Sequence, residues 1–172
     1  MKSSKTEKEK ARTALKYIIP ILEKYKFKWC ISGGFACYLH GVDRPIKAID
    51  IDIEIPKDNP KFIGFINEVR EFTELPFQLW IDKNYDNWVT DVVIDSQYLS
   101  ICDTPDLKLF NKKTGKYEVF YKSGIPKPVI IEFEGLQLPI APKESVLKMK
   151  LALAHKKPID RVDIKGMKEL VS

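Results

Sequence analysis

Apolar residues recur along this chain with two different spacings, one typical of helices and one typical of strands. Near the start the spacing is helical and predicts a helix over about 5–26. Pro20 lies inside that segment and is expected to kink the helix or split it into two pieces. The apolar stripe consists of Ala11, Leu15, Ile18, Ile19 and Leu22, with lysines opposite.

The middle of the chain alternates apolar and polar residues, which favours strands, and helical spacing returns near the end. The predicted elements are strands at 28–32, 49–55, 77–81 and 88–94, short helices at 35–39 and 58–72, hairpins at 107–121 and 129–138, and helices at 142–154 and 160–170. The expected fold class is α+β, a mostly antiparallel or mixed sheet flanked by helices. A single domain over 1–172 is expected: the N-terminal helix, a core at about 28–140 and C-terminal helices at about 142–171.

Composition narrows the class of protein. Apolar residues make up 44% of the 172 residues and charged residues 31%, as in soluble globular proteins. No apolar run approaches the roughly 18 residues that a membrane span needs. The charged first ten residues are not followed by a signal-peptide core. We therefore expect a cytoplasmic protein without membrane association. The net charge of +5 slightly favours a polyanionic partner, although lysines also serve solubility.

Cysteine and histidine usage argues against two kinds of site. Cys30, Cys37 and Cys102 are odd in number and include no Cys-x-x-Cys pair, which disfavours a disulfide framework and a zinc site. His40 and His155 are the only histidines, so a histidine-based metal cluster is not expected. His40 is expected to cap or pack beside the short helix.

The sequence 28–55 combines two features that suit phosphate chemistry. A strand ends at Ser32 and runs into Gly33-Gly34, where the absence of side chains lets the backbone approach a phosphate closely. On the next strand Asp50 and Asp52 point to one face, because strand side chains alternate. Paired carboxylates suit a hard cation such as Mg²⁺, and a pair of such ions can activate a hydroxyl and neutralise a leaving pyrophosphate.

A simpler interpretation exists for each feature taken alone. Asp50, Asp52 and Glu54 can form the wet face of an amphipathic strand. However, aspartate is a poor strand former, and three acids in line repel one another without a lysine between them. The glycine turn and the acidic strand together, in this order, are more specific than either.

The segment Trp29-Cys-Ile-Ser-Gly-Gly-Phe-Ala-Cys-Tyr-Leu-His-Gly-Val-Asp-Arg-Pro-Ile-Lys-Ala-Ile-Asp-Ile-Asp-Ile53 resembles the active-site motif of the DNA polymerase β-like nucleotidyltransferase superfamily. Within it the segment is most similar to AbiEii-type toxin nucleotidyltransferases and to aminoglycoside and lincosamide nucleotidyltransferases. The spacing from Arg44 to Asp50 is longer than in the usual motif. The positions that match are Gly33, Gly34, Ala36, Gly41, Arg44, Asp50 and Asp52.

The resemblance implies an enzyme that moves a nucleoside monophosphate from an NTP to a hydroxyl with Mg²⁺, held at a two-ion site. It implies that Asp50 and Asp52 hold the metal and that a third carboxylate from a neighbouring strand completes the site and acts as a base. Asp91 is our choice, because an acid followed by an apolar run fits the third strand. Asp95, predicted on the same strand face, and Glu132 are the alternatives.

The C-terminal segment 144–164 is similar to the ending of AbiEii-type proteins. By position Lys150 would contact the nucleotide, and Asp160 would be a supporting acid. The alternatives are a solvated lysine on an amphipathic helix and an N-cap of the last helix. The predicted nucleotide-binding set is Ser32, Gly33, Gly34, Arg44 and Lys150.

The acceptor is less defined than the site. The excess of lysine slightly favours RNA as the acceptor. For a toxin-like enzyme this RNA would be tRNA, and a cognate antitoxin protein would be a partner. The alternatives are a binding module that kept the fold without turnover, and a small antibiotic-type transferase. Trp80, Tyr85 and Trp88 are either base-stacking residues or, more commonly for strand aromatics, sheet packing.

Overall fold

The computed structural model describes residues 5–172, and its first element is a single long helix, α1 (Glu7–Tyr25). Thr6 caps this helix, and Glu9 completes a capping box. Pro20 is expected to kink or split the helix; the helix runs through it as one element, so a split is wrong. Buried apolar residues on both sides of Pro20, Ile18 and Ile21 among them, hold the helix against the sheet, and this packing outweighs one lost hydrogen bond.

The other predicted elements are present, several with shifted bounds. They are β1 (Trp29–Ser32), α2 (Gly33–Leu39), β2 (Ala48–Ile53), α3 (Pro60–Glu68), the 3₁₀ turn η1 (Arg70–Phe72), β3 (Thr73–Ile81), β4 (Tyr85–Ile94), β5 (Gln97–Asn111), β6 (Lys116–Val119), β7 (Val129–Phe133), β8 (Leu136–Ile140), α4 (Lys143–Ala152) and α5 (Pro158–Val171). The largest difference is β5, a 15-residue strand of which only the last residues were predicted.

One mixed sheet runs through the molecule, in the order β3-β4-β5-β2-β1-β8-β7, with β6 paired to β5. The pairs β2–β5 and β1–β8 are parallel, and the other pairs are antiparallel. The expected α+β class with a mixed sheet is therefore confirmed. Because β5 lies between β2 and β4, it brings together strands that are far apart along the chain.

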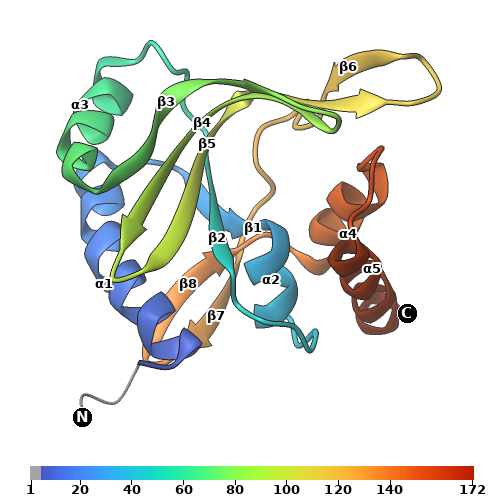
Figure 1. The fold of residues 1–172 in the computed structure, drawn as a ribbon, viewed down its shortest axis with the longest axis horizontal. Coiled ribbons are helices and arrows are strands. Elements are labelled where there is room, and N and C mark those ends of the chain that lie inside the picture. Colours follow the sequence, from blue (N-terminus) through green and yellow to red (C-terminus); the bar gives the residue numbers. More distant parts are fainter. Residues whose placement is uncertain (1–4) are drawn as a thin grey trace.

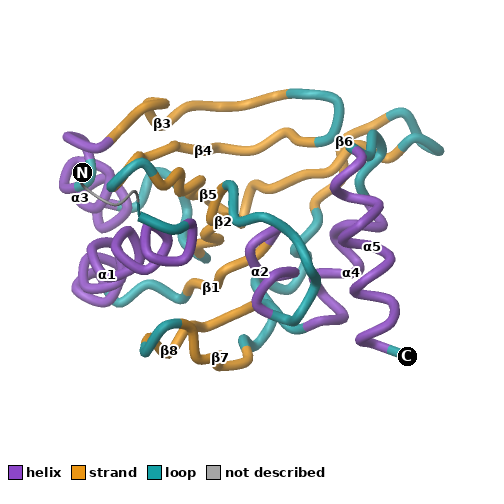
Figure 2. Tube along the Cα trace, turned by 60° about the horizontal axis from the view of Figure 1, so that its bottom comes forward, coloured by secondary structure: helices purple, strands orange, loops and turns teal. Residues whose placement is uncertain are grey.

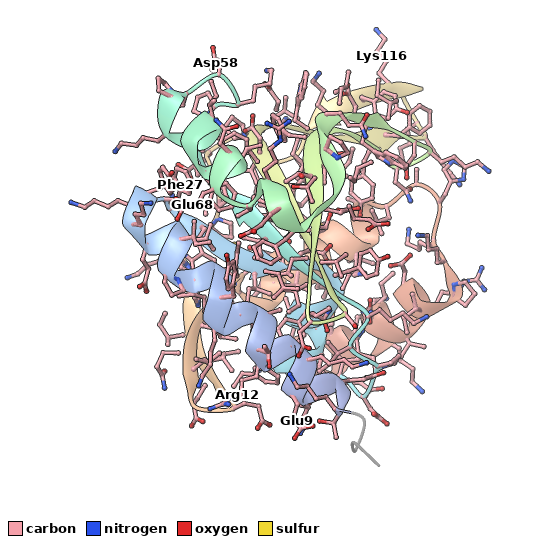
Figure 3. All side chains as sticks on the ribbon, turned by 60° about the vertical axis from the view of Figure 1, so that its left-hand side comes forward. Glu9, Arg12, Phe27, Asp58, Glu68 and Lys116 are labelled. Carbon is pink, nitrogen blue, oxygen red and sulfur yellow. The ribbon has the colours of Figure 1, made fainter. Side chains whose placement is uncertain are left out.

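Helices cover both faces of the sheet. Figure 2 shows α1 and α3 on one side and α2, α4 and α5 on the other. Helices α1 and α3 are joined by a Lys24–Glu68 ion pair of 2.7 Å beside Phe27. Figure 3 views this side of the molecule. Within residues 5–172 no helix is both long and apolar enough to cross a membrane.

Candidate functional site

The glycine turn and the first acidic residue are held together by strand pairing. β1 and β2 are antiparallel with Ser32 opposite Asp50, so Gly33 follows directly beside the Asp50 side chain. Gly33 has φ +59°, and a Cβ there would lie 1.9 Å from Asp50 Oδ2. The N–H of Gly34 donates to the same oxygen at 3.3 Å. The turn therefore requires glycine for two reasons, its left-handed backbone and the close carboxylate.

Four aspartates, Asp50, Asp52, Asp82 and Asp91, line one cavity of about 330 Å³, and the three predicted ones lie on β2 and β4, the strands on either side of β5. Ser100 on β5 pairs with Asp50 on one side and with Asp91 of β4 on the other, and directly paired residues share a face of the sheet. Asp52 lies two residues further along β2 and also lines the cavity.

Asp50, Asp52 and Asp91 line the same cavity, but their carboxylates do not meet around one point. Within the part of the chain that the structure describes, no three Asp, Glu, His or Cys side chains form a group that could hold a metal ion. Asp91 Oδ1 is nevertheless buried without a hydrogen-bond partner. A buried acceptor of this kind is costly alone, so the site suits a cation or a polar ligand that supplies the missing contact.

Burial dominates the electrostatics of Asp50 and Asp52. It raises the pKa of Asp52 to about 7, against hydrogen bonds from Tyr121 and Ser32 that lower it. Tyr121 donates its hydroxyl to Asp52 Oδ2 at 2.9 Å. Burial also raises the pKa of Asp50, opposed by the positive charge of Lys150 and by the Gly34 N–H. A bound cation would favour the ionised form of both acids.

A buried ion cluster faces the carboxylates from α4 and α5. Lys150 donates to Asp160 and approaches Asp163, each at 2.8 Å. Arg44 reaches both oxygens of Asp163, at 2.5 and 2.6 Å. Burial alone would lower the pKa of Lys150, but its bonds to Asp160 and Asp163 raise it above the ordinary value. The lysine at the cavity wall therefore stays charged.

This chain resembles known proteins in structure rather than in sequence. No protein-family model and no curated protein sequence matches the chain. A Thermotoga maritima protein provisionally described as a nucleotidyltransferase matches 96% of this chain and 95% of its own length, with a TM-score of 0.66 and 16% identity. The lincosamide adenylyltransferase LnuA, solved with lincomycin, matches over 98% and 99%, with a TM-score of 0.56 and 20% identity. ANT(2'')-Ia, solved with adenylyl-2''-tobramycin, matches over 94% and 90%, with a TM-score of 0.56 and 11% identity.

The chain has the fold of these nucleotidyltransferase structures. The closer likeness to AbiEii-type toxins stays a prediction.

On this nucleotidyltransferase fold, most of the predicted residues face one cavity. Its walls include Ser32, Gly33, Gly34, Asp50, Asp52, Asp91 and Lys150. Arg44 is not among them. Its guanidinium lies behind Gly34, where a Cβ would come within 2.4 Å of Nη1, and it is paired with Asp163. The predicted direct contact of Arg44 with a nucleotide is not supported by this placement, because the side chain is committed to a buried ion pair.

The structure separates the three candidates for the third carboxylate. Asp95 does not lie on the strand face but in the turn after β4, with φ 52° and a 2.6 Å ion pair to Lys5. Glu132 lies on β7, at the far edge of the sheet, and accepts from the N–H of Gly135. Only Asp91 of the three lines the cavity.

The structure also tests the alternative interpretations of Asp160 as an N-cap and of Lys150 as a solvated lysine. Asp160 is not the N-cap of the last helix, because α5 begins two residues earlier, at Pro158. It is the third residue of the helix and accepts from the backbone N–H of Lys157 at 2.8 Å. Lys150 is buried rather than solvated. His40 packs beside α2, as expected, with Nε2 2.8 Å from the Ala141 carbonyl oxygen.

The preferred interpretation of the strand aromatics as sheet packing holds for Trp88 only, and the sequence interpretation did not include Tyr121 in the site. Trp80 and Tyr85 line the cavity, whereas Trp88 packs against Phe77, with ring centroids 5.4 Å apart. Odd-numbered and even-numbered positions of a strand face opposite sides, and this signal could have separated Tyr85 from Trp88. Tyr121 lies outside any strand, and nothing in the local sequence pointed to its contact with Asp52.

Proposed function

We propose that this protein is a Mg²⁺-dependent nucleotidyltransferase. The observation that carries the proposal is the convergence of Asp50, Asp52 and Asp91 on one cavity beside the Gly33-Gly34 turn. The fold supports it, since LnuA, described as an adenylyltransferase, and ANT(2'')-Ia, solved with an adenylylated tobramycin, share the arrangement of elements. Acids with raised pKa values in a cavity are common at catalytic sites.

The donor set fits a divalent cation. Asp50 and Asp52 offer carboxylate oxygens from one strand, and the unpartnered Oδ1 of Asp91 offers another from across β5. Bound Mg²⁺ would supply charge neutralisation at the phosphates. Ionised carboxylates are required, so the raised pKa of Asp52, about 7, makes cation binding stronger as pH rises toward 8.

The remaining residues position the NTP and move a proton. The hydroxyl of Ser32 and the backbone at Gly33 are the polar groups that can approach the phosphates, and charged Lys150 balances their negative charge. An acceptor hydroxyl oxygen forms a bond to the α-phosphorus while the bond to pyrophosphate breaks. Asp91 takes the proton of the acceptor. Catalysis rests on positioning and charge stabilisation.

The test is transfer of label from each α-³²P-labelled NTP, with Mg²⁺, to total RNA, to aminoglycosides and lincosamides, and to the protein itself. We expect transfer by the wild type and a loss of at least a hundredfold in Asp50→Asn and Asp91→Asn. Asp95→Asn is the matched control, since it removes a carboxylate outside the cavity, and should retain activity. Equal transfer by all three variants would overturn the metal-site assignment.

A second candidate function is a nucleotide-binding module without turnover. The observation that favours it is the lack of a ready-made group of three metal ligands in residues 5–172. For this function, Mg²⁺-NTP would raise the melting temperature, since a ligand that binds the folded state stabilises it, but no acceptor would be labelled. Absence of both stabilisation and transfer would exclude both functions.

A further inference from the structure

A second and larger hollow, of about 1170 Å³, lies beside the carboxylate cavity. We name it the lysine groove. Its walls are the end of β5, β6, the segment 119–127, and the outer side and C-terminal end of α4. Figure 1 shows the β5–β6 hairpin above α4, and Figure 3 shows Lys116 at the tip of that hairpin, pointing away from the molecule.

The groove concentrates positive charge. Its lining holds one acid, Glu118, against six lysines, a net of +5 that equals the formal net charge of the whole chain. The lysines are Lys112, Lys113, Lys122, Lys127, Lys148 and Lys156.

These six lysines have no acidic partner among the described residues, whereas seven lysines elsewhere in residues 5–172 do. Lys5, Lys24 and Lys28 each pair with a carboxylate within 2.7 Å, whereas none of the six forms an ion pair with any described residue. Glu118 is already bonded to Asn111 and Thr114. A concave surface lined by unbalanced charge of one sign concentrates the opposite charge, so the groove fits a polyanion.

Aromatic and hydroxyl groups lie among the charges. Lys148 Nζ sits 5.7 Å from the ring centre of Phe120, and that ring meets Tyr121 edge-on at 4.9 Å. Ser123 and Ser145 add hydroxyls to the lining. Single-stranded nucleic acids are held by cations that follow the backbone and by aromatic rings beside the bases, and hydroxyls can pair with the ribose 2′-OH.

The groove also adjoins the proposed catalytic site. Tyr121 lines the groove while its hydroxyl donates to Asp52. Along α4, Lys148 and Leu151 face the groove while Met149 and Lys150 face the cavity. Tyr121 and α4 therefore form the wall between groove and cavity, and a chain lying in the groove runs beside the carboxylates.

We propose that the lysine groove binds single-stranded RNA and presents a ribose hydroxyl of that RNA to the cavity as the acceptor. The proposal rests on the proposed nucleotidyl transfer and names its acceptor class. A groove of this charge disfavours cationic acceptors such as aminoglycosides, in contrast to ANT(2'')-Ia, which was solved with an adenylylated tobramycin. The ribose hydroxyl oxygen forms the bond to the α-phosphorus as the bond to pyrophosphate breaks, and Asp91 takes the proton.

The test measures binding of a fluorescent single-stranded RNA of about 12 nucleotides, within the span of typical single-strand sites, by anisotropy across a salt series. The groove variant carries Lys113→Ala, Lys122→Ala and Lys148→Ala. The matched control carries Lys16→Ala, Lys61→Ala and Lys168→Ala, three exposed lysines elsewhere with the same loss of charge. We expect the groove variant to bind at least tenfold more weakly, with the salt slope reduced by about 2, and the control to change less than twofold.

Several results would overturn the groove assignment. Equal weakening in both triple variants would show that net charge alone attracts RNA. No RNA binding by the wild type, or tighter binding of an acidic peptide or of single-stranded DNA of the same sequence, would exclude RNA as the occupant. Thermal stabilisation by Mg²⁺-NTP separates the two proposals, because the groove variant should keep it. If Mg²⁺-NTP does not stabilise the wild type, that result counts against the proposed function instead.

Discussion

Gly33 meets two constraints at a single residue. Its φ of +59° strains any L side chain, and the position of a Cβ is taken by the Asp50 carboxylate. Gly115 has a similar φ of +66°, but nothing lies within 4 Å of its Cβ position. A side chain would meet backbone strain at both positions but a steric clash only at Gly33, so comparing the two distinguishes these effects.

Gly33→Ala should destabilise the protein by about 2–4 kcal/mol and weaken Mg²⁺-NTP binding, because Asp50 must move. Gly115→Ala should cost about 1 kcal/mol, from backbone strain alone. Urea unfolding and thermal shift with Mg²⁺-NTP measure both. Equal costs in the two variants would contradict the close approach at Gly33.

The Tyr121 hydroxyl acts on Asp52 from outside the sheet. Its hydrogen bond favours the ionised carboxylate, so Tyr121→Phe should raise the pKa of Asp52 above about 7. The pH midpoint for Mg²⁺ binding, followed by calorimetry, should then rise by roughly 1 unit. Tyr117→Phe is the control, because that hydroxyl donates to the Asp82 carbonyl at 2.6 Å instead. A midpoint that stays or falls in Tyr121→Phe would refute the coupling.

Between elements, Asp163 holds three parts of the chain together. It lies on α5 with no exposed surface and accepts from Arg44, in the segment before β2, and from Lys150 on α4. Removing one member of a buried ion cluster leaves the others uncompensated. The connection of α4 and α5 to the glycine turn therefore depends on this carboxylate.

Asp163→Asn should lower the free energy of unfolding by about 3–5 kcal/mol. Asp95→Asn makes the same chemical change in the exposed pair with Lys5 and should cost less than about 1 kcal/mol, since asparagine also tolerates its left-handed backbone. Chemical denaturation of both variants checks this. Similar losses would mean that the buried cluster adds no special stability.

Strand β5 shows why element prediction failed in one place. Its residues Asp103-Thr104-Pro105-Asp106 break the apolar alternation, and Asp95-Ser96 turn the chain without a glycine or proline signal. Pairing with β2 and β4 up to Asp103, and with β4 and β6 again from Lys108, nevertheless carries the strand across this segment. Tertiary pairing overrides local preference in strands more readily than in helices. The helices at both ends, with regular apolar stripes and capping residues, were predicted within a few residues.

For the whole molecule, Asp103 makes stability depend on pH. It has no exposed surface, and neither of its oxygens has a hydrogen-bond partner. Burial and the nearby Asp106 raise its pKa to about 6. Because the unfolded chain ionises this group near pH 4, the stabilising contribution is full below pH 4 and is lost as pH rises through about 6.

Asp103→Asn should therefore be more stable than the wild type by about 1–3 kcal/mol at pH 7.5 and nearly equal to it at pH 4. The comparison with the wild type cancels the contributions of Asp50 and Asp52. Urea denaturation at the two pH values provides the measurement. A difference that does not change with pH would show that ionisation of Asp103 is not the cause.

The sequence by itself determined the local parts of the candidate site. Gly33-Gly34 follows its strand directly, and Asp50 and Asp52 share a face because strand side chains alternate, so neither needs long-range information. Tertiary packing alone places Asp91, and not Asp95 or Glu132, in the cavity wall, brings Tyr121 to Asp52 and pairs Arg44 with Asp163. Each of these depends on the order of strands and the docking of helices, because contacts between distant segments are set by packing of the whole chain.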